Sequence, residues 1–456
     1  MDFIFLPFSL RQYRFFIRKQ MKYYSTNKKV PLATLKEAVV KGLAADNGLF
    51  MPTRIEKFPA AFFETIQQHT FQEIAFEVAK SYFGEDVELN SLKEIVYDTL
   101  QFDCPVVQVT DAVYSLELFH GPTMAFKDVG ARFMARLLNY FLAGNNRQVH
   151  VLVATSGDTG SAVANGFLGV EGIHVHVLYP KGKVSKIQES QFATLGQNIT
   201  ALEVDGTFDD CQRMVKTAFL DEQLNENLLL TSANSINVAR FLPQSFYYFN
   251  AYARLKEIGA LDGKELVVSV PSGNLGNLTA GLFAHKSGLP VAQFLAANNE
   301  NDVVFEYLKT GKYNPRPSVE TIANAMDVGA PSNFARILDL YGYSHSEISS
   351  LIAGARYSDD QIRKAIKDLF EQTGYLCDPH GACGFMALQQ YLKQGQTGVF
   401  LETAHPAKFT KTVEEVIGAG KVPLPEKLAR FMKGEKQSLP MSTDFQSFKK
   451  YLKEWY

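Results

Sequence analysis

Lys127 is the residue of this sequence whose position most strongly suggests chemistry. It follows a Gly-Pro turn and lies in the first turn of a helix that the apolar period predicts over residues 125–142. A cation there opposes the positive end of the helix dipole. Two interpretations stay open: the flexible stem carries the ammonium out to water, or the amine has a depressed pKa and serves Schiff-base chemistry.

A polar loop follows the apolar run at residues 149–154. It reads Thr-Ser-Gly-Asp-Thr-Gly-Ser over residues 155–161 and leads into a predicted helix. Hydroxyls, glycines and the free N–H groups of a helix N-terminus form an anion site when they follow a strand. A carboxylate or a phosphate would fit, although Asp158 would repel it unless that side chain points away. A capped turn without a ligand is the alternative.

Two further strand ends carry groups suited to anions. Residues 271–277 read Pro-Ser-Gly-Asn-Leu-Gly-Asn, and two glycines three apart let a backbone wrap a phosphate at a helix N-terminus. This is neither a P-loop nor a dinucleotide turn, which argues against nucleotide chemistry. Asn234, Ser235 and Arg240 follow another apolar run and offer the donors that a dianionic phosphate favours. A surface ion pair is the alternative for Arg240.

The histidines and cysteines give weaker signals. His120 and His405 flank motif residues, and a structural role such as orienting a loop is favoured for both. Cys377, His380 and Cys383 lie close together in sequence, but no fourth ligand is evident. An ordinary loop is therefore predicted around these three residues, with no metal.

The composition excludes several classes of function. The 456 residues carry a formal net charge of -2, which gives no electrostatic basis for binding nucleic acid or an anionic membrane. No apolar run reaches the roughly 18 residues that a membrane span needs. The four cysteines lack zinc-ribbon spacing and are few for the length, which is typical of a reducing compartment and favours a cytoplasmic protein.

The order of the predicted elements indicates an α/β fold. Between residues 113 and 300, apolar strand-like runs alternate with helical stretches such as 208–219 and 238–258. This alternation predicts open, mostly parallel sheets with helices on both faces. Surface connections are predicted at residues 313–317 and 433–444.

Four segments are predicted along the chain. Residues 1–20 form an N-terminal extension, either disordered or upstream of the true start. Residues 21–110 form a mainly helical lobe, in which Thr34 and Glu37 have capping-box spacing. Residues 111–260 form an α/β region with the lysine and the first loop. Residues 261–456 form an α/β region with the glycine-containing loop and the C-terminal helices.

Several motifs together resemble the threonine synthase family, whose members have the tryptophan synthase β fold. The segments that carry this resemblance are 41–52, 120–128, 155–160, 271–277 and 403–409. The resemblance extends from Met21 nearly to the C-terminus and is closest to the longer branch of the family. It implies a fold type II enzyme with two α/β sheets and with pyridoxal 5'-phosphate (PLP) as its cofactor.

The resemblance also implies roles for individual residues. Lys127 is expected to be catalytic and to form the Schiff base with PLP. The residues expected to hold the cofactor with it are Gly273, Asn274, Leu275, Gly276 and Asn277 at its phosphate, and Thr403 against its pyridine nitrogen. The residues expected to hold the substrate are Thr155, Ser156, Gly157 and Thr159 at its α-carboxylate, and Asn234, Ser235 and Arg240 at its phosphate. Relatives of the fold usually carry asparagine in place of Asp158, so the bond from this position to the 3-oxygen of PLP is an open question.

The implied reaction converts O-phospho-L-homoserine and water to L-threonine and phosphate, by γ-elimination and β-addition, as the last step of threonine biosynthesis. A monomer or a homodimer is expected. One alternative is an amino-acid dehydratase of the same fold, which has no use for Arg240. Another is a non-catalytic homologue that binds a phosphorylated ligand, against which the presence of Lys127 stands.

Overall fold

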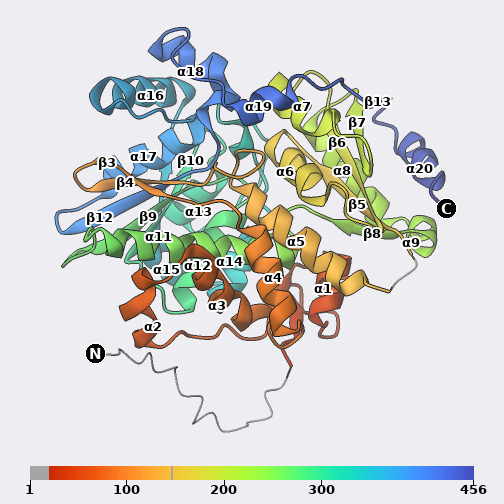
Figure 1. The fold of residues 1–456 in the computed structure, drawn as a ribbon, viewed down its shortest axis with the longest axis horizontal. Coiled ribbons are helices and arrows are strands. Elements are labelled where there is room, and N and C mark those ends of the chain that lie inside the picture. The colour runs from red at the N-terminus through yellow and green to blue at the C-terminus, as the bar shows by residue number, and fades with distance from the viewer. Residues whose placement is uncertain (1–19, 145–146) are drawn as a thin grey trace, which may run out of the picture.

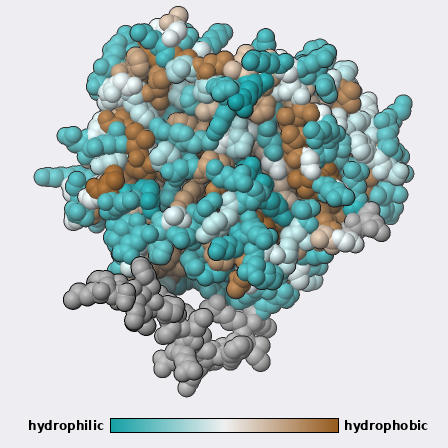
Figure 2. Space-filling view, in the orientation of Figure 1, coloured by the Kyte–Doolittle hydropathy of each residue, from teal (hydrophilic) through white to brown (hydrophobic). Residues whose placement is uncertain are grey.

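The computed structural model describes residues 20–144 and 147–456 (Figure 1). The N-terminal extension predicted at residues 1–20 therefore lies outside the described residues, apart from Gln20. None of the helices in the described ranges is both long and apolar enough to cross a membrane. Figure 2 shows a mainly hydrophilic face on which hydrophobic residues form small separate patches.

The larger sheet has six strands in the order β11-β10-β9-β12-β4-β3 and lies on the left of Figure 1. Its strands are parallel except for β3, which pairs with β4 in the antiparallel sense. In chain order they are β3 (Val106–Thr110), β4 (Val113–Glu117), β9 (Glu265–Pro271), β10 (Gln293–Asn298), β11 (Ile352–Arg356) and β12 (Gln396–Glu402).

The smaller sheet has five parallel strands in the order β13-β7-β6-β5-β8 and lies on the right of Figure 1. In chain order they are β5 (Val149–Ala154), β6 (Ile173–Pro180), β7 (Ile199–Val204), β8 (Leu229–Ser232) and β13 (Ser438–Met441). Two short strands, β1 (Tyr23–Ser25) and β2 (Phe50–Pro52), pair separately in the antiparallel sense.

The strand β5 of the smaller sheet is buried along its whole length because helices cover both faces of the sheet. Val149, Val151 and Val153 of β5 pack into one core, and Leu152 and Ala154 pack into another. A strand buried on both faces loses the alternation of apolar and polar residues. The run at residues 149–154, apolar except for His150, is the sequence pattern that results.

Helices surround both sheets. The N-terminal helices are α1 (Leu35–Lys41), α2 (Ala60–Thr65), α3 (Phe71–Phe83) and α4 (Leu89–Thr99), followed by the central α5 (Lys127–Leu142). Around the smaller sheet lie α6 (Asp158–Phe167), α7 (Lys186–Ala193), α8 (Phe208–Leu220), α9 (Glu222–Asn227) and α20 (Phe445–Lys453). The remaining helices are α10 (Val238–Phe241), α11 (Ser245–Glu257), α12 (Gly276–Lys286), α13 (Val303–Thr310), α14 (Phe334–Leu340), α15 (His345–Leu351), α16 (Asp359–Thr373), α17 (Pro379–Tyr391), α18 (Thr410–Ile417) and α19 (Glu426–Phe431).

The predicted α/β fold with two mostly parallel sheets and an N-terminal helical region is confirmed. The capping box of Thr34 and Glu37 is present at the start of α1. Three local predictions are wrong. The helix predicted over 238–258 is interrupted by a 3₁₀ turn that contains Pro243, a residue without an N–H group to donate. The connection predicted at 433–444 contains β13, and the loop predicted around Cys383 is the helix α17.

A cluster of three histidines lies between the smaller sheet and the C-terminal helix. His150 Nδ1 is 3.0 Å from His176 Nε2, and His176 Nδ1 is 2.8 Å from the hydroxyl of Tyr451. The ring of His174 is 4.1 Å from that of Trp455, between centroids. Burial lowers the pKa of His150 and of His174 to about 4, and it holds the pKa of His176 well below its ordinary value.

We expect this cluster to make the C-terminal packing sensitive to acid. A histidine in the unfolded chain has a pKa of 6.5 and binds a proton more readily than these buried rings do. The contribution of the neutral histidines to the stability of the folded protein is therefore complete above pH 6.5 and declines as the pH falls toward 4. Trp455 is the only tryptophan in the chain, so its fluorescence should change in this window. In His150→Gln the change in Trp455 fluorescence should occur at lower pH. A constant signal down to pH 4 would contradict the prediction.

Candidate active site

The segment that carries Lys127 is held against the end of β12. The Phe126 N–H donates to the Thr403 carbonyl at 2.9 Å, and Ala125 forms an isolated antiparallel bridge with Ala404. The hydroxyl of Tyr247 donates to the Phe126 carbonyl. These contacts fix the first turn of α5 beside the C-terminal end of the larger sheet, the edge at which parallel sheets bind ligands.

The environment of Lys127 increases the neutral fraction of its amine. Burial lowers the pKa of Lys127 to about 8. Asp158 opposes this shift, whereas the cations Lys408 and Arg240 add to it. No hydrogen bond or ion pair to the Lys127 amine is found within the described residues. A larger neutral fraction near pH 7 is what an amine needs in order to act as a nucleophile.

The loop after β5 is folded by Thr155. Its hydroxyl accepts hydrogen bonds from the N–H groups of Gly157 and Gly160, at 2.9 and 2.8 Å. The Thr155 side chain is therefore occupied in shaping the start of α6. Ser156 and Thr159 are partly exposed, and among the described residues their hydroxyls have no hydrogen-bond partner. These two hydroxyls are the side-chain donors of this loop that are available to a ligand.

The loop after β9 places free donors at the start of α12. Leu275 has φ of 61°, a left-handed conformation that costs a non-glycine residue free energy and recurs at functional sites. Asn277 is buried, its Oδ1 accepts from the Tyr248 hydroxyl at 2.8 Å, and its Nδ2 has no partner within the described part of the chain. A buried donor without a partner is costly unless a ligand completes it.

The predicted anion loops meet at Asn274 and Ser235. Asn274 Nδ2 donates to Ser235 Oγ at 2.9 Å, and a Cβ added at Gly276 would lie 3.0 Å from Ser235 Cβ. Asn234 Nδ2 lies 3.3 Å from the Ala154 carbonyl, at the end of β5. Three loops that are widely separated in sequence thus form one polar surface, and a side chain at position 276 would crowd Ser235.

Arg240 is buried beside the start of α5. Its Nη1 donates to the Ala233 carbonyl at 2.6 Å, and its Nε has no partner among the described residues. Burial lowers the pKa of Arg240 to about 10, which leaves the guanidinium charged. No carboxylate within the described residues forms an ion pair with it. A buried cation without an anion is suited to an anionic ligand.

A second buried arginine, Arg336 of α14, supports the same loop. Its guanidinium donates to the carbonyls of Ser235 and Ile236, to the Phe50 carbonyl and to Asn333 Oδ1. Burial lowers the pKa of Arg336 to about 9, so it also remains charged near neutral pH. Sequence reasoning missed Arg336, because nothing in its local pattern distinguishes it from a surface arginine on an amphipathic helix.

Thr403 and the two candidate histidines differ in whether their polar atoms are free to bind a ligand. Thr403 is 7% exposed, and its hydroxyl makes no hydrogen bond to any described residue. His405 Nδ1 accepts from the Ala407 N–H at 3.0 Å and so caps the following turn. His120 Nε2 is 2.8 Å from Glu117 Oε2 at the surface. The two histidines therefore have structural contacts, whereas the Thr403 hydroxyl is free for a ligand.

The cysteines and the histidine that lie close together in sequence have partners other than a metal. Cys377 Sγ is 3.2 Å from Glu402 Oε2, and His380 Nδ1 is 2.6 Å from Asp378 Oδ1. Asp378 also accepts from the Ala404 N–H at 3.2 Å. This cluster supports the strand end that carries Thr403. Within the described ranges no group of histidine, cysteine and acidic side chains has the arrangement of a metal site.

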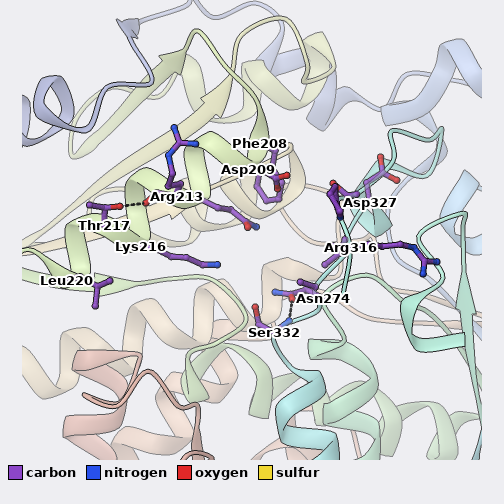
Figure 3. Close-up of a pocket in the computed structure, with 16 residues that line it drawn as sticks. Phe208, Asp209, Arg213, Lys216, Thr217, Leu220, Asn274, Arg316, Asp327 and Ser332 are labelled. Atoms are coloured by element: carbon purple, nitrogen blue, oxygen red, sulfur yellow. Dashed lines mark hydrogen bonds between the residues drawn. The ribbon is translucent and has the colours of Figure 1, made fainter. Parts of the chain in front are cut away.

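A cavity of about 420 Å³ opens beside Asn274, between α8 and the segment around residues 316–332 (Figure 3). Lys216 of α8 and Arg316 are among its cationic lining residues. Asn274 and Ser332 line it next to the loop that follows β9. Burial raises the pKa of Asp327, another lining residue, to about 6. Lys127 does not line the cavity, and Asn274 is the one predicted site residue that does.

Sequence reasoning also missed the partner of Asp158. Lys408 Nζ lies 2.9 Å from Asp158 Oδ1, and both side chains are almost fully buried. Lys408 is within the 403–409 motif, but no pattern in that motif indicates that a lysine turns inward. Asp158 is thus a paired carboxylate and not an isolated one.

These groups fit PLP. The Lys127 amine has a lowered pKa, Asn277 Nδ2 is an unpaired buried donor at a helix N-terminus, and the Thr403 hydroxyl is free. An amine, a phosphate cradle and a hydroxyl are what this cofactor needs from a protein. The fold and the site together define a PLP-dependent enzyme, and the family described as "Pyridoxal-phosphate dependent enzyme" matches residues 106–403.

The chain belongs to the threonine synthase family. The descriptions "Threonine synthase N terminus" and "Threonine synthase, C-terminal" match residues 22–100 and 381–452. A threonine synthase of Serratia marcescens is 43% identical over 409 residues, which are 90% of this chain and 94% of that protein. Membership of the family makes the chain a PLP-dependent lyase of threonine biosynthesis.

Solved structures of threonine synthases resemble this chain over nearly its whole length. The threonine synthase of Escherichia coli superimposes with a TM-score of 0.89 at 40% identity and covers 95% of this chain and 100% of its own. A PLP-bound threonine synthase from Brucella melitensis has a TM-score of 0.88 at 32% identity, with coverage of 96% and 99%. The serine racemase of maize is 17% identical with a TM-score of 0.51, covering 69% of this chain and 92% of its own, which is a likeness of fold alone.

Proposed function

We propose that this chain converts O-phospho-L-homoserine and water to L-threonine and phosphate. The observation that carries the proposal is Arg240, a buried charged guanidinium with an unpaired Nε that influences the pKa of Lys127. A substrate phosphate would supply the missing anion. An amino-acid dehydratase acting on serine or threonine would leave this charge without a partner.

Each ligand group has a proposed set of residues. Lys127 would carry PLP as a Schiff base, the loop of residues 273–277 would hold its phosphate, and the Thr403 hydroxyl would face its pyridine nitrogen. The loop of residues 155–159 would bind the substrate α-carboxylate. Asn234, Ser235 and Arg240 would bind the substrate phosphate, with Arg336 fixing the carbonyls of that loop.

PLP, when bound, delocalises the negative charge that develops on the substrate carbons. The protein's own contribution is to bind, orient and transfer protons. A Lys127 amine with a pKa of about 8 can accept a proton from Cα and return it near neutral pH. The Ser156 and Thr159 hydroxyls orient the α-carboxylate, and Arg240 stabilises the phosphate as it leaves.

The cellular setting is also part of the proposal. All four cysteines are buried and free, which suits the reducing cytoplasm. A monomer or a homodimer is proposed, with a small molecule as the substrate. The division of the chain near residues 110 and 260 stays a prediction.

The proposal is tested by assaying the purified protein with O-phospho-L-homoserine and measuring phosphate, threonine and 2-oxobutanoate in the same sample. We expect threonine and phosphate in equal amounts. Deamination of threonine to 2-oxobutanoate, or of serine to pyruvate, as the main activity would instead indicate the dehydratase. Bound PLP without turnover of any of these substrates would contradict the substrate assignment and leave the cofactor assignment in place.

A further inference from the structure

A buried ion pair lies beside Lys127 and has no role in the reaction described above. Lys408 Nζ is 2.9 Å from Asp158 Oδ1, and the two side chains are 0% and 4% exposed. Gln188 Nε2 donates to the same oxygen at 2.9 Å. Within the described residues Asp158 Oδ2 accepts no hydrogen bond. Both donors therefore hold the carboxylate by one oxygen.

Three elements fix this pair in place. Asp158 is the first residue of α6, Gln188 is in α7, and Lys408 is in the 3₁₀ turn Pro406–Phe409 that follows β12. Gly157 has φ of 142°, and a Cβ there would lie 2.5 Å from the Gln188 side chain. Glycine at this position gives Gln188 access to the carboxylate. The local structure is thus built around the Asp158 carboxylate.

The ion pair of Asp158 and Lys408 is not expected to stabilise the fold much by itself. Taking a lysine and an aspartate out of water costs free energy that their attraction only partly offsets, and apolar pairs of similar volume are often as stable. Burial by itself would raise the pKa of Asp158, but Lys408 and Lys127 outweigh it and hold that pKa at about 2. The carboxylate is therefore ionised, and the charge of Lys127 also acts on it.

We infer that Lys408 is a positioning residue for the reaction: it engages the Asp158 carboxylate and so keeps the amine of Lys127 free to carry the cofactor. Without Lys408, the Asp158 charge would be available to Lys127, and an ion pair between these two would favour the protonated amine. This inference rests on the proposed role of Lys127 as the lysine that carries PLP.

Other charged groups also act on Lys127 and Lys408, and the variants compared below leave them unchanged. Arg240 of α10 acts on Lys127 as a further cation. Asp128 of α5 and His405 each interact with Lys408. Since none of these is altered, a shift in the titration of Lys127 reports on the Asp158 and Lys408 charges.

The experiment compares four full-length proteins: wild type, Lys408→Met, Asp158→Asn and the double variant. In the cofactor-free proteins, the rate at which acetic anhydride acylates Lys127 is measured against pH by peptide mass spectrometry, because only the neutral amine reacts. In the holoenzymes, the pH midpoint of the visible absorbance of bound PLP gives a second measurement. Lys408→Gln, which keeps a hydrogen-bond donor without the charge, replaces Lys408→Met if that variant does not fold.

We expect Lys408→Met to raise the acylation midpoint of Lys127 by about one pH unit or more, the effect of an opposite charge within a few ångströms. Asp158→Asn should lower it, and the double variant should return it toward the wild-type value. The absorbance midpoint should move in the same directions. Opposite single effects that cancel in the double variant are a pattern that loss of packing alone does not produce.

An unchanged or lowered acylation midpoint in folded Lys408→Met or Lys408→Gln would overturn the inference. A double variant that shifts as far as the Lys408 variant would overturn it as well, and so would a loss of turnover without any change in pH dependence. Failure of the proposed role of Lys127 is seen separately, because PLP would then remain linked to the protein in Lys127→Ala. Failure of the substrate assignment is seen as bound PLP without turnover, whatever the acylation results.

Discussion

Lys127→Ala is expected to reduce threonine formation from O-phospho-L-homoserine by at least about a thousandfold, because it removes both the nucleophile that carries PLP and the group that moves protons at Cα. The apoprotein should fold normally. Burial lowers the pKa of Lys127, and within the described residues its amine makes no hydrogen bond, so its removal leaves no partner unsatisfied. Threonine and phosphate release, with the visible absorbance of bound PLP, measure the effect.

Lys183→Ala is the matched control. Lys183 is 60% exposed and pairs at the surface with Glu320, so its loss should leave turnover and cofactor absorbance unchanged. If Lys127→Ala kept more than about a tenth of wild-type turnover, general acid–base chemistry at this amine could not be the source of catalysis. Another lysine would then have to carry the cofactor.

Arg240→Ala is expected to lower kcat/KM for O-phospho-L-homoserine by about a hundredfold, because a charge-assisted hydrogen bond to a buried guanidinium is worth up to about 3 kcal/mol. Bound PLP should keep its absorbance, since the cofactor groups lie on other residues. The kcat/KM of Arg240→Lys should lie between those of the wild type and Arg240→Ala, because lysine restores the charge without the planar guanidinium. Steady-state kinetics of threonine and phosphate release provide the measurement.

Arg430→Ala serves as the control for Arg240→Ala, because Arg430 forms an exposed ion pair with Glu426 on α19. Its kinetics should match the wild type. Full turnover of the phosphorylated substrate by a folded Arg240→Ala protein would contradict the assignment of the substrate phosphate. Serine or threonine deamination that is equal in wild type and Arg240→Ala would support the dehydratase instead.

The parts of the fold with strong periodicity were predictable from sequence. The strands at residues 149–154 and 199–204 have the predicted bounds, because most of their residues are apolar and buried under the helices of the smaller sheet. β13 was missed because it is a short edge strand with exposed residues, and its pairing with β7 comes from tertiary contact. The 3₁₀ turn at Pro243 shows how one proline overrides a helical period.

The site was predictable where a loop follows a strand, and not where a single side chain turns inward. Asn274 and Ser235 were both predicted, and the structure brings them within hydrogen-bonding distance. Arg336 and Lys408 were not predicted, because an inward arginine or lysine has the same sequence as an outward one. Only the packing of distant segments decides which side chains of this type are buried.

The position of β12 has a consequence for how the chain folds. This strand is late in sequence, yet it lies between β9 and β4 in the middle of the larger sheet. Until residue 402 has been synthesised, β4 and β9 have unpaired edges, and such edges are open to aggregation. Pairings this distant in sequence also close slowly. The larger sheet, and with it the bridge from Ala404 to the segment of Lys127, therefore forms only after nearly the whole chain has been made.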